Sequence, residues 1–150
     1  LAKKYKNVID LESSLYKYDN SLIENIPVEK RKGLRDRKIN KDWPLNYINK
    51  RKESIELYDI VLVWIHKDVL KLYEENKIEY ILCYPNSNAI DIYKQRYINR
   101  GNRKEYIDKV VNTYDVVKKE FDEKDAEKII LDGEETLEDY LLKNGFKLIK

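Results

Sequence analysis

The chain has 150 residues, of which 42% are hydrophobic and 39% are charged, and its formal net charge of only +2 argues against a general nucleic-acid binder. This length is typical of one domain with a real core, and the apolar run at residues 60–65 is far shorter than the roughly 20 residues of a membrane-spanning helix. The short run leads us to expect no binding to membranes. A lone Cys83 forms no internal disulfide, so we expect a protein of the reducing cytoplasm.

Residues 1–5 have the pattern of the last turn of a helix that leads into a short strand at 7–11. The strand ends in the polar residues Glu12, Ser13 and Ser14. Since the chain opens without an initiator methionine, we expect a segment to precede it. A processed amino terminus is the alternative.

Basic residues then cluster at 30–38, in an irregular stretch before Pro44. A charge run in a loop is usually a solvated surface. Pro44 is suited to the first turn of a helix, and the spacing of Leu45, Ile48 and Ile55 predicts one apolar stripe on that helix.

Two apolar runs, 59–65 and 78–85, are joined by a helical pattern at 68–76. Parallel strands need a crossover of about this length, so the pattern predicts a β-α-β unit buried on both faces. Ligands of open α/β sheets lie beyond the carboxyl ends of the strands. We therefore expect function near His66, Lys67 and Asp68 after the first strand and near Tyr84, Pro85 and Asn86 after the second.

The second half of the chain is predicted to be mainly helical. A helix at about 89–99 is interrupted at 100–102 and followed by a long amphipathic helix at 103–120. A short strand at 129–131 comes next, and then a helix for which Thr136 and an acidic third position provide a variant of the capping box.

The order of these elements resembles the P-loop nucleoside and nucleotide kinase fold, of the nucleoside-monophosphate-kinase type. Several segments more narrowly resemble those of small kinase-like ATPases that are common in phage genomes. These segments are residues 10–14, 42–48, 60–63, 66–69, 84–85 and 97–102. The resemblance covers nearly the whole chain. It implies a three-layer α/β fold with a mostly parallel sheet, formed by a single domain over residues 1–150 with a lid at about 94–104.

One defining feature of that family does not occur in this sequence. The family's first strand leads into the phosphate-binding loop G-x-x-x-x-G-K-[ST], whose backbone amides and lysine hold phosphates. The loop either lies upstream of Leu1 or has been lost together with the usual means of binding ATP. Loss of the central strand would leave two rows of backbone groups unpaired, so we expect the loop and its strand upstream.

Four residues of the first half are candidates for the site. By the resemblance, Asp10 would act as a base or lie near a metal ion, and Ser13 and Ser14 would contact the phosphate acceptor. The alternative is a polar loop that caps a helix. His66, the one histidine, could polarise a phosphate or an acceptor hydroxyl, although a histidine in this position is more often structural.

Three arginines of the second half, Arg96, Arg100 and Arg103, recur at spacings of four and three residues. If the helix continued through Gly101, they would form one cationic edge. The resemblance implies that they are lid arginines, which neutralise the transferring phosphoryl group, with Gly101 as a hinge. A solvated face paired with acidic residues is the alternative.

Three classes of function remain. The first is an ATP-dependent phosphotransferase, or a related P-loop NTPase, that acts on a nucleoside, a nucleotide or a polynucleotide end with ATP and Mg²⁺. The second is a non-catalytic protein, such as a phage factor that binds a host protein through a degenerate kinase scaffold. The third is a nucleic-acid binder that uses residues 30–41, which the net charge makes the least favoured.

Overall fold

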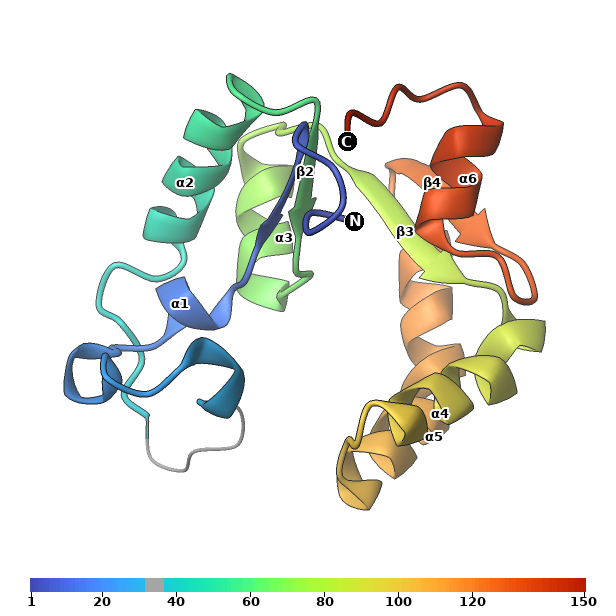
Figure 1. Ribbon diagram of the computed structural model, residues 1–150, viewed down its shortest axis with the longest axis horizontal. Coiled ribbons are helices and arrows are strands. Elements are labelled where there is room, and N and C mark those ends of the chain that lie inside the picture. The colour runs from blue at the N-terminus through green and yellow to red at the C-terminus, as the bar shows by residue number, and fades with distance from the viewer. Residues whose placement is uncertain (32–36) are drawn as a thin grey trace. The chain divides into compact units, whose positions relative to one another are not determined.

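A computed structural model describes residues 1–31 and 37–150, which form two compact units. The first unit comprises Leu1–Lys77 together with Leu148–Lys150, and the second comprises Ile78–Lys147 (Figure 1). Both are mixed α/β units built around a pair of parallel strands. That the 150 residues form one kinase-like domain stays a prediction.

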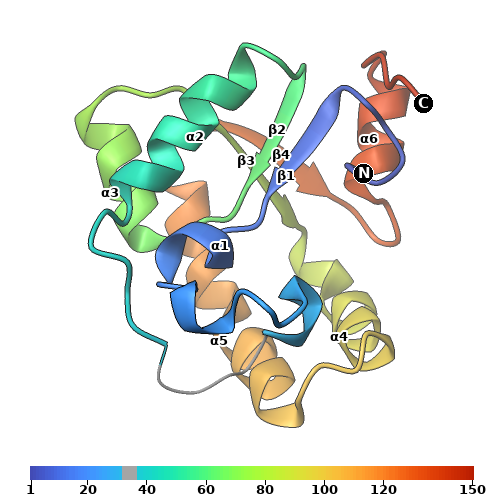
Figure 2. The ribbon, with the colours of Figure 1, turned by 60° about the vertical axis from the view of Figure 1, so that its left-hand side comes forward.

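The first unit is built on the parallel pair β1 and β2, with Val8 opposite Ile60 and Leu11 opposite Val63. Helix α2 contacts β2 and runs beside the strand pair (Figure 2). The elements of this unit are β1 (Val8–Leu11), α1 (Ser14–Lys17), the short 3-10 turns at Ser21–Ile23 and Val28–Lys30, α2 (Leu45–Ile55), β2 (Ile60–Val63) and α3 (Lys67–Glu75).

The predicted apolar stripe of α2 is wrong at two of its three positions. Leu45 is 60% exposed and Ile55 is 46% exposed, whereas Tyr47 and Ile48 are buried. The helix is turned so that the Tyr47 ring faces inward, because this large ring fills the core and its hydroxyl reaches backbone groups at the ends of both strands. Aliphatic spacing alone could not reveal a tyrosine in that role.

The two ends of the chain meet at Asn7. Its side-chain amide donates to Asp59 Oδ2 at 2.8 Å and accepts from the backbone N–H of Ile149 at 2.9 Å. Lys6 N–H also donates to the Ile149 carbonyl at 2.6 Å. Residues 1–5, predicted to end a helix, form a single turn in which the N–H groups of Lys4 and Tyr5 both donate to the Leu1 carbonyl.

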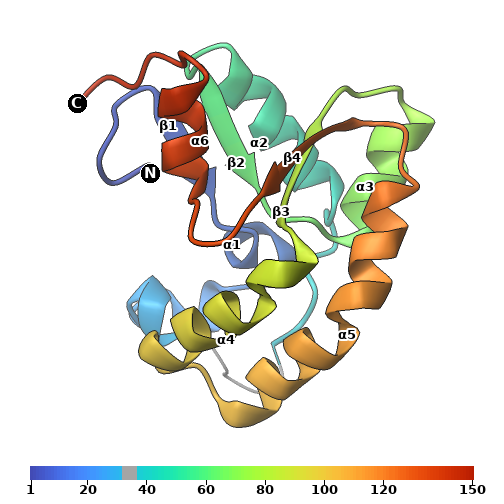
Figure 3. The same cartoon turned by 90° about the vertical axis from the view of Figure 1, so that its right-hand side faces the viewer.

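The second unit is built on the parallel pair β3 and β4, with Ile81 opposite Glu127 and Pro85 opposite Leu131. Helices α5 and α6 lie on opposite faces of this pair (Figure 3). The elements of this unit are β3 (Ile81–Pro85), a 3-10 turn (Ser87–Ala89), α4 (Ile90–Asn99), α5 (Lys104–Asp122), β4 (Glu127–Leu131) and α6 (Leu137–Lys143).

A predicted helix break and a predicted helix cap of this unit are confirmed. The break between α4 and α5 occurs at Gly101, whose φ of +72° is strained for other residues. At the start of α6, the Thr136 side chain accepts from Asp139 N–H at 3.2 Å, and the Asp139 carboxylate accepts from Thr136 N–H at 2.9 Å. Both signals are local, which is why the sequence alone predicted them.

The prediction of a mostly parallel α/β arrangement is confirmed at this coarse level, since both strand pairs are parallel. In the described residues the strands form two sheets, β1–β2 in the first unit and β3–β4 in the second. The three-layer sheet of the nucleoside-monophosphate-kinase type stays a prediction. None of the described helices has the length and apolar character needed to cross a bilayer.

Candidate functional site

Polar side chains meet at the carboxyl ends of β1 and β2. Ser13 follows β1, and His66 follows β2 as the residue that precedes α3. His66 Nε2 lies 3.3 Å from Ser13 Oγ, and His66 Nδ1 lies 3.5 Å from Lys17 Nζ. Parallel pairing of β1 and β2 explains the juxtaposition, because it brings the two carboxyl ends to the same edge.

The partners of His66 assign its tautomer. A lysine ammonium has only donors, so Nδ1 accepts from Lys17 and the ring proton lies on Nε2. Nε2 then donates to Ser13 Oγ, which leaves the serine hydroxyl proton directed elsewhere. In this arrangement His66 is not a base for Ser13, whose hydroxyl proton is left for another acceptor.

Burial lowers the pKa of His66 from its ordinary value, and the Lys17 ammonium lowers it further. The Asp68 carboxylate acts in the opposite direction. Since the ordinary pKa of histidine is already about 6.5, His66 is neutral at pH 7. The cationic group of this cluster is therefore Lys17.

Both tryptophans of the chain lie against the His66 ring. The Trp43 ring meets it edge-on with centroids 5.2 Å apart, and the Trp64 centroid lies 6.5 Å away. Trp43 Nε1 donates to Asp68 Oδ2 at 3.1 Å, and Lys17 Nζ lies 5.6 Å from the centroid of the Trp43 ring. We call Ser13, Lys17, Trp43, Trp64, His66 and Asp68 the His66 cluster.

Tyr47 positions the backbone on which the cluster is built. Its side chain is fully buried, and its hydroxyl donates to the Leu11 carbonyl at 2.9 Å while accepting from Trp64 N–H at 2.9 Å. The ring also packs on Trp43, with centroids 5.5 Å apart. Burial raises the pKa of Tyr47, so the hydroxyl stays protonated and keeps both bonds.

The candidate residues of the first unit divide into two groups. The structure brings Ser13 and His66 together, which the sequence analysis had named as separate candidates. Ser14 instead begins α1, where its N–H lies 3.4 Å from Glu12 Oε1 and its carbonyl accepts from Asn20. Asp10 lies exposed within β1. Their proposed roles stay predictions.

The candidate arginines belong to the second unit and do not form one helical edge. The break at Gly101 leaves Arg96 within α4, Arg100 at its end and Arg103 just before α5. Arg96 Nη2 donates to the Glu134 carbonyl at 2.7 Å, and its guanidinium stacks on Tyr93. The condition for a continuous cationic edge is therefore not met.

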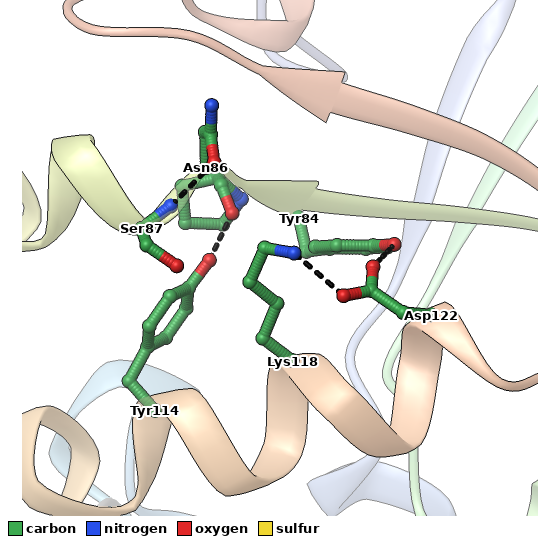
Figure 4. Close-up of polar contacts among 7 residues, drawn as sticks. Tyr84, Asn86, Ser87, Tyr114, Lys118 and Asp122 are labelled. Carbon is green, nitrogen blue, oxygen red and sulfur yellow. Dashed lines mark hydrogen bonds and ion pairs between the residues drawn. The ribbon is translucent and has the colours of Figure 1, made fainter.

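At the carboxyl end of β3 the polar groups bond to one another (Figure 4). Tyr84 hydroxyl donates to one oxygen of Asp122 at 2.6 Å, and Lys118 Nζ lies 2.6 Å from the other. Tyr114 hydroxyl donates to the Pro85 carbonyl. Burial, with the Asp122 carboxylate, raises the pKa of Tyr84 to about 12, and Lys118 and Tyr84 lower the pKa of Asp122.

Asn86, which the sequence also singled out, makes local bonds at this strand end. Its side-chain oxygen accepts from Ser87 N–H at 2.8 Å (Figure 4). Its own backbone N–H donates to the Leu131 carbonyl at 2.7 Å. These bonds shape the turn between β3 and the 3-10 turn at Ser87–Ala89. They favour a structural reading of this strand end.

The basic cluster at 30–38 is described only at its ends, because residues 32–36 lie outside the described part of the chain. Arg31 donates to the carbonyls of Ile26 and Glu24, at 2.6 Å and 2.8 Å. The Arg37 guanidinium lies 4.0 Å from the centroid of the Tyr18 ring. These contacts position loop backbone and give no specific evidence of nucleic-acid binding.

No group of three or more metal-ligating side chains occurs in residues 1–31 and 37–150. Comparisons with models of protein families, with curated proteins and with solved structures give no match for this chain. The candidate site therefore stands on the geometry of the His66 cluster.

Sequence reasoning missed Lys17, Trp43, Trp64 and Tyr47. Lys17 and the two tryptophans lie within a few residues of predicted strand ends or of Pro44, so proximity to these boundaries was an available signal. Tyr47 is one of 13 tyrosines of the chain, and no local pattern distinguishes it from the others.

Proposed function

We propose that this chain belongs to an ATP-dependent phosphotransferase that acts on a nucleoside, a nucleotide or a polynucleotide end. The observation that carries the proposal is the His66 cluster, which gathers a cation, a hydroxyl donor and two indole rings beyond the ends of two parallel strands. This is the position in which open α/β sheets bind their ligands. A related P-loop NTPase would need the same groups.

The side chains of the cluster suit a phosphate group. Lys17 provides a positive charge, and among the described residues its ammonium donates only to His66, which leaves further donors for a ligand. Ser13 is 9% exposed and held by His66, so its hydroxyl is pre-oriented. In this proposal the neutral His66 ring orients Ser13, and Lys17 offsets negative charge on the bound phosphate.

ATP and Mg²⁺ enter the proposal through the resemblance to nucleotide kinases. Mg²⁺ commonly takes one or two carboxylates together with substrate phosphates. Asp10 and Glu12, at the end of β1, are the carboxylates nearest in sequence to Ser13 and are the proposed metal or acceptor contacts. Arg96, Arg100 and Arg103 remain the proposed lid arginines.

The proposal also needs a phosphate-binding loop, which residues 1–150 do not contain. Under the proposal, a segment outside these residues supplies the loop and the strand before it. Ile60 N–H donates to the Asn7 carbonyl, so the backbone groups of Ile60 face β1. Backbone groups alternate along a strand, so those of Leu62 also face β1, and those of Val61 and Val63 face the opposite edge of β2. In the described residues β2 pairs only with β1, which leaves this apolar edge for a further strand.

Assay of the complete natural protein with ATP and Mg²⁺ against nucleosides, nucleotides and polynucleotide ends tests the proposal. We expect labelled phosphate to reach one of these acceptor classes. Lys17→Ala should lower turnover at least tenfold, whereas Lys52→Ala, which removes an exposed lysine of α2, should not. The proposal fails if the folded protein turns over none of the acceptors.

A further inference from the structure

Trp64 is the exposed aromatic surface of the His66 cluster. It directly follows β2, and its side chain is 58% exposed, although large aromatic side chains usually bury most of their area. The partner tryptophan, Trp43, is half-buried and uses its indole N–H to bind Asp68. The two indoles therefore differ: one is committed to the fold and the other presents a free face.

The backbone of Trp64 is held although its ring is exposed. Its N–H donates to the hydroxyl of the fully buried Tyr47, at 2.9 Å, and its ring leans on His66 with an angle of 59° between the planes. Within the described residues, no acceptor for the Trp64 indole N–H occurs. A fixed, exposed indole is a surface on which a planar ring stacks at little entropic cost.

The same His66 ring contacts a cation. Lys17 Nζ lies 3.5 Å from Nδ1, and Ser13 Oγ lies 3.3 Å from Nε2. The cluster thus places an exposed aromatic ring, a cation and a hydroxyl group around one imidazole. A ligand that satisfies both parts carries a planar ring and, beyond a short spacer, a negatively charged group.

We propose that Trp64 is a specificity-determining residue that stacks on the planar ring of a ligand whose anionic group binds Lys17 and Ser13. A nucleoside monophosphate has this chemistry, with its sugar as the spacer. The choice of ligand rests on the proposed function, but the stacking role of Trp64 rests on the cluster itself.

Tryptophan fluorescence provides a direct probe, because both tryptophans of the chain lie in this cluster. The complete protein is titrated with the four common nucleoside monophosphates, with the matching nucleosides and with ribose 5-phosphate. We expect at least one monophosphate to quench the emission. The nucleoside should bind more weakly because it lacks the negatively charged phosphate. Ribose 5-phosphate should bind more weakly because it lacks the planar base.

Affinities of variants are measured by calorimetry, which does not depend on tryptophan emission. Trp64→Ala should weaken binding of the monophosphate about 10-fold, as expected for one lost base–aromatic stack. Trp64→Phe retains a smaller ring and should weaken binding less. Leu57→Ala is the matched control, because Leu57 is a large apolar side chain of the same unit that is 76% exposed.

The outcomes separate this inference from the proposed function. Ring-dependent binding that Trp64→Ala weakens supports the inference even if the protein transfers no phosphate. Unchanged binding by folded Trp64→Ala overturns it, even if phosphotransfer is found. The inference also fails if no monophosphate binds more tightly than ribose 5-phosphate, or if Leu57→Ala weakens binding as much as Trp64→Ala.

Discussion

The two strand pairs of this protein end in polar clusters that differ in how their hydrogen-bonding groups are used. At the end of β3, Tyr84 and Lys118 both bond to Asp122, and Tyr114 bonds to the Pro85 carbonyl. Beyond β1 and β2, the Lys17 ammonium and the Ser13 hydroxyl keep donors that the described residues do not use. The first arrangement stabilises a fold, and the second is suited to a ligand.

The comparison shows why residue type at a strand end is a poor guide to function. Both ends offer a basic group, an acidic group and aromatic rings. Their difference lies in partners that are distant in sequence, such as Tyr84 and Asp122 or Ser13 and His66. Polar groups that saturate one another have little left for a ligand, whereas groups with spare donors gain from binding one.

The largest effect is expected from Tyr47→Phe. Losing the buried hydroxyl leaves the Leu11 carbonyl and the Trp64 N–H without their partner, and we expect the free energy of unfolding to fall by about 2 kcal/mol in a urea titration. Tyr114→Phe removes a single bond at the other strand end and should cost about 1 kcal/mol. Equal losses would contradict a special role for Tyr47.

Thr136→Ala tests whether local polar bonds stabilise the second unit. Loss of the capping box at the start of α6 should lower the free energy of unfolding by about 1 kcal/mol, read from thermal or urea denaturation. Thr113→Ala is the control, because Thr113 lies exposed within α5 and alanine is the better helix former. If the two variants lose equal stability, the cap is not the cause.

Asp122→Asn tests the network beyond β3 through its dependence on pH. The pKa of Asp122 is lowered in the folded protein by Lys118 and Tyr84, so its contribution is present above the ordinary value of 3.8 and is lost as the pH falls below it. We expect the variant to melt at a lower temperature than the natural protein at pH 7. The difference should shrink below about pH 4, and a difference that grows on acidification would contradict this reading.

The smallest effect concerns the charge state of His66, the single histidine, which NMR can follow as one ring signal. We expect it to titrate below 6.5, because burial and Lys17 lower its pKa. Lys17→Ala should raise the value part of the way back, since burial remains, and Lys52→Ala should leave it unchanged. A signal that titrates above 6.5 in the natural protein would argue against the assigned contacts.

The free energy of unfolding should also fall on acidification because of the His66 cluster. The folded pKa is lowered, so the contribution of neutral His66 is present above about pH 6.5 and is lost as the pH falls through the folded value. At the two strand ends, acidification therefore acts in different pH ranges: below about 6.5 for His66 and below about 4 for Asp122.

What the sequence determined by itself is local. The apolar runs of β2 and β3, the break at Gly101 and the capping box at Thr136 depend on neighbouring residues, and each is found near its predicted place. The sequence named Ser13 and His66 as separate candidates, because each follows a predicted strand, but it did not pair them. The stripe on α2 was wrong, because burial of Leu45 and Ile55 depends on how the whole helix is turned.

Only the tertiary structure decided which strand ends meet and which polar groups bind one another. The tautomer of His66, the saturation of Asp122 and the bridge from Tyr47 to Leu11 and Trp64 all join residues far apart in the chain. Contacts of this kind depend on packing and register rather than on local preference. They separate a strand end that is suited to a ligand from one that bonds to itself.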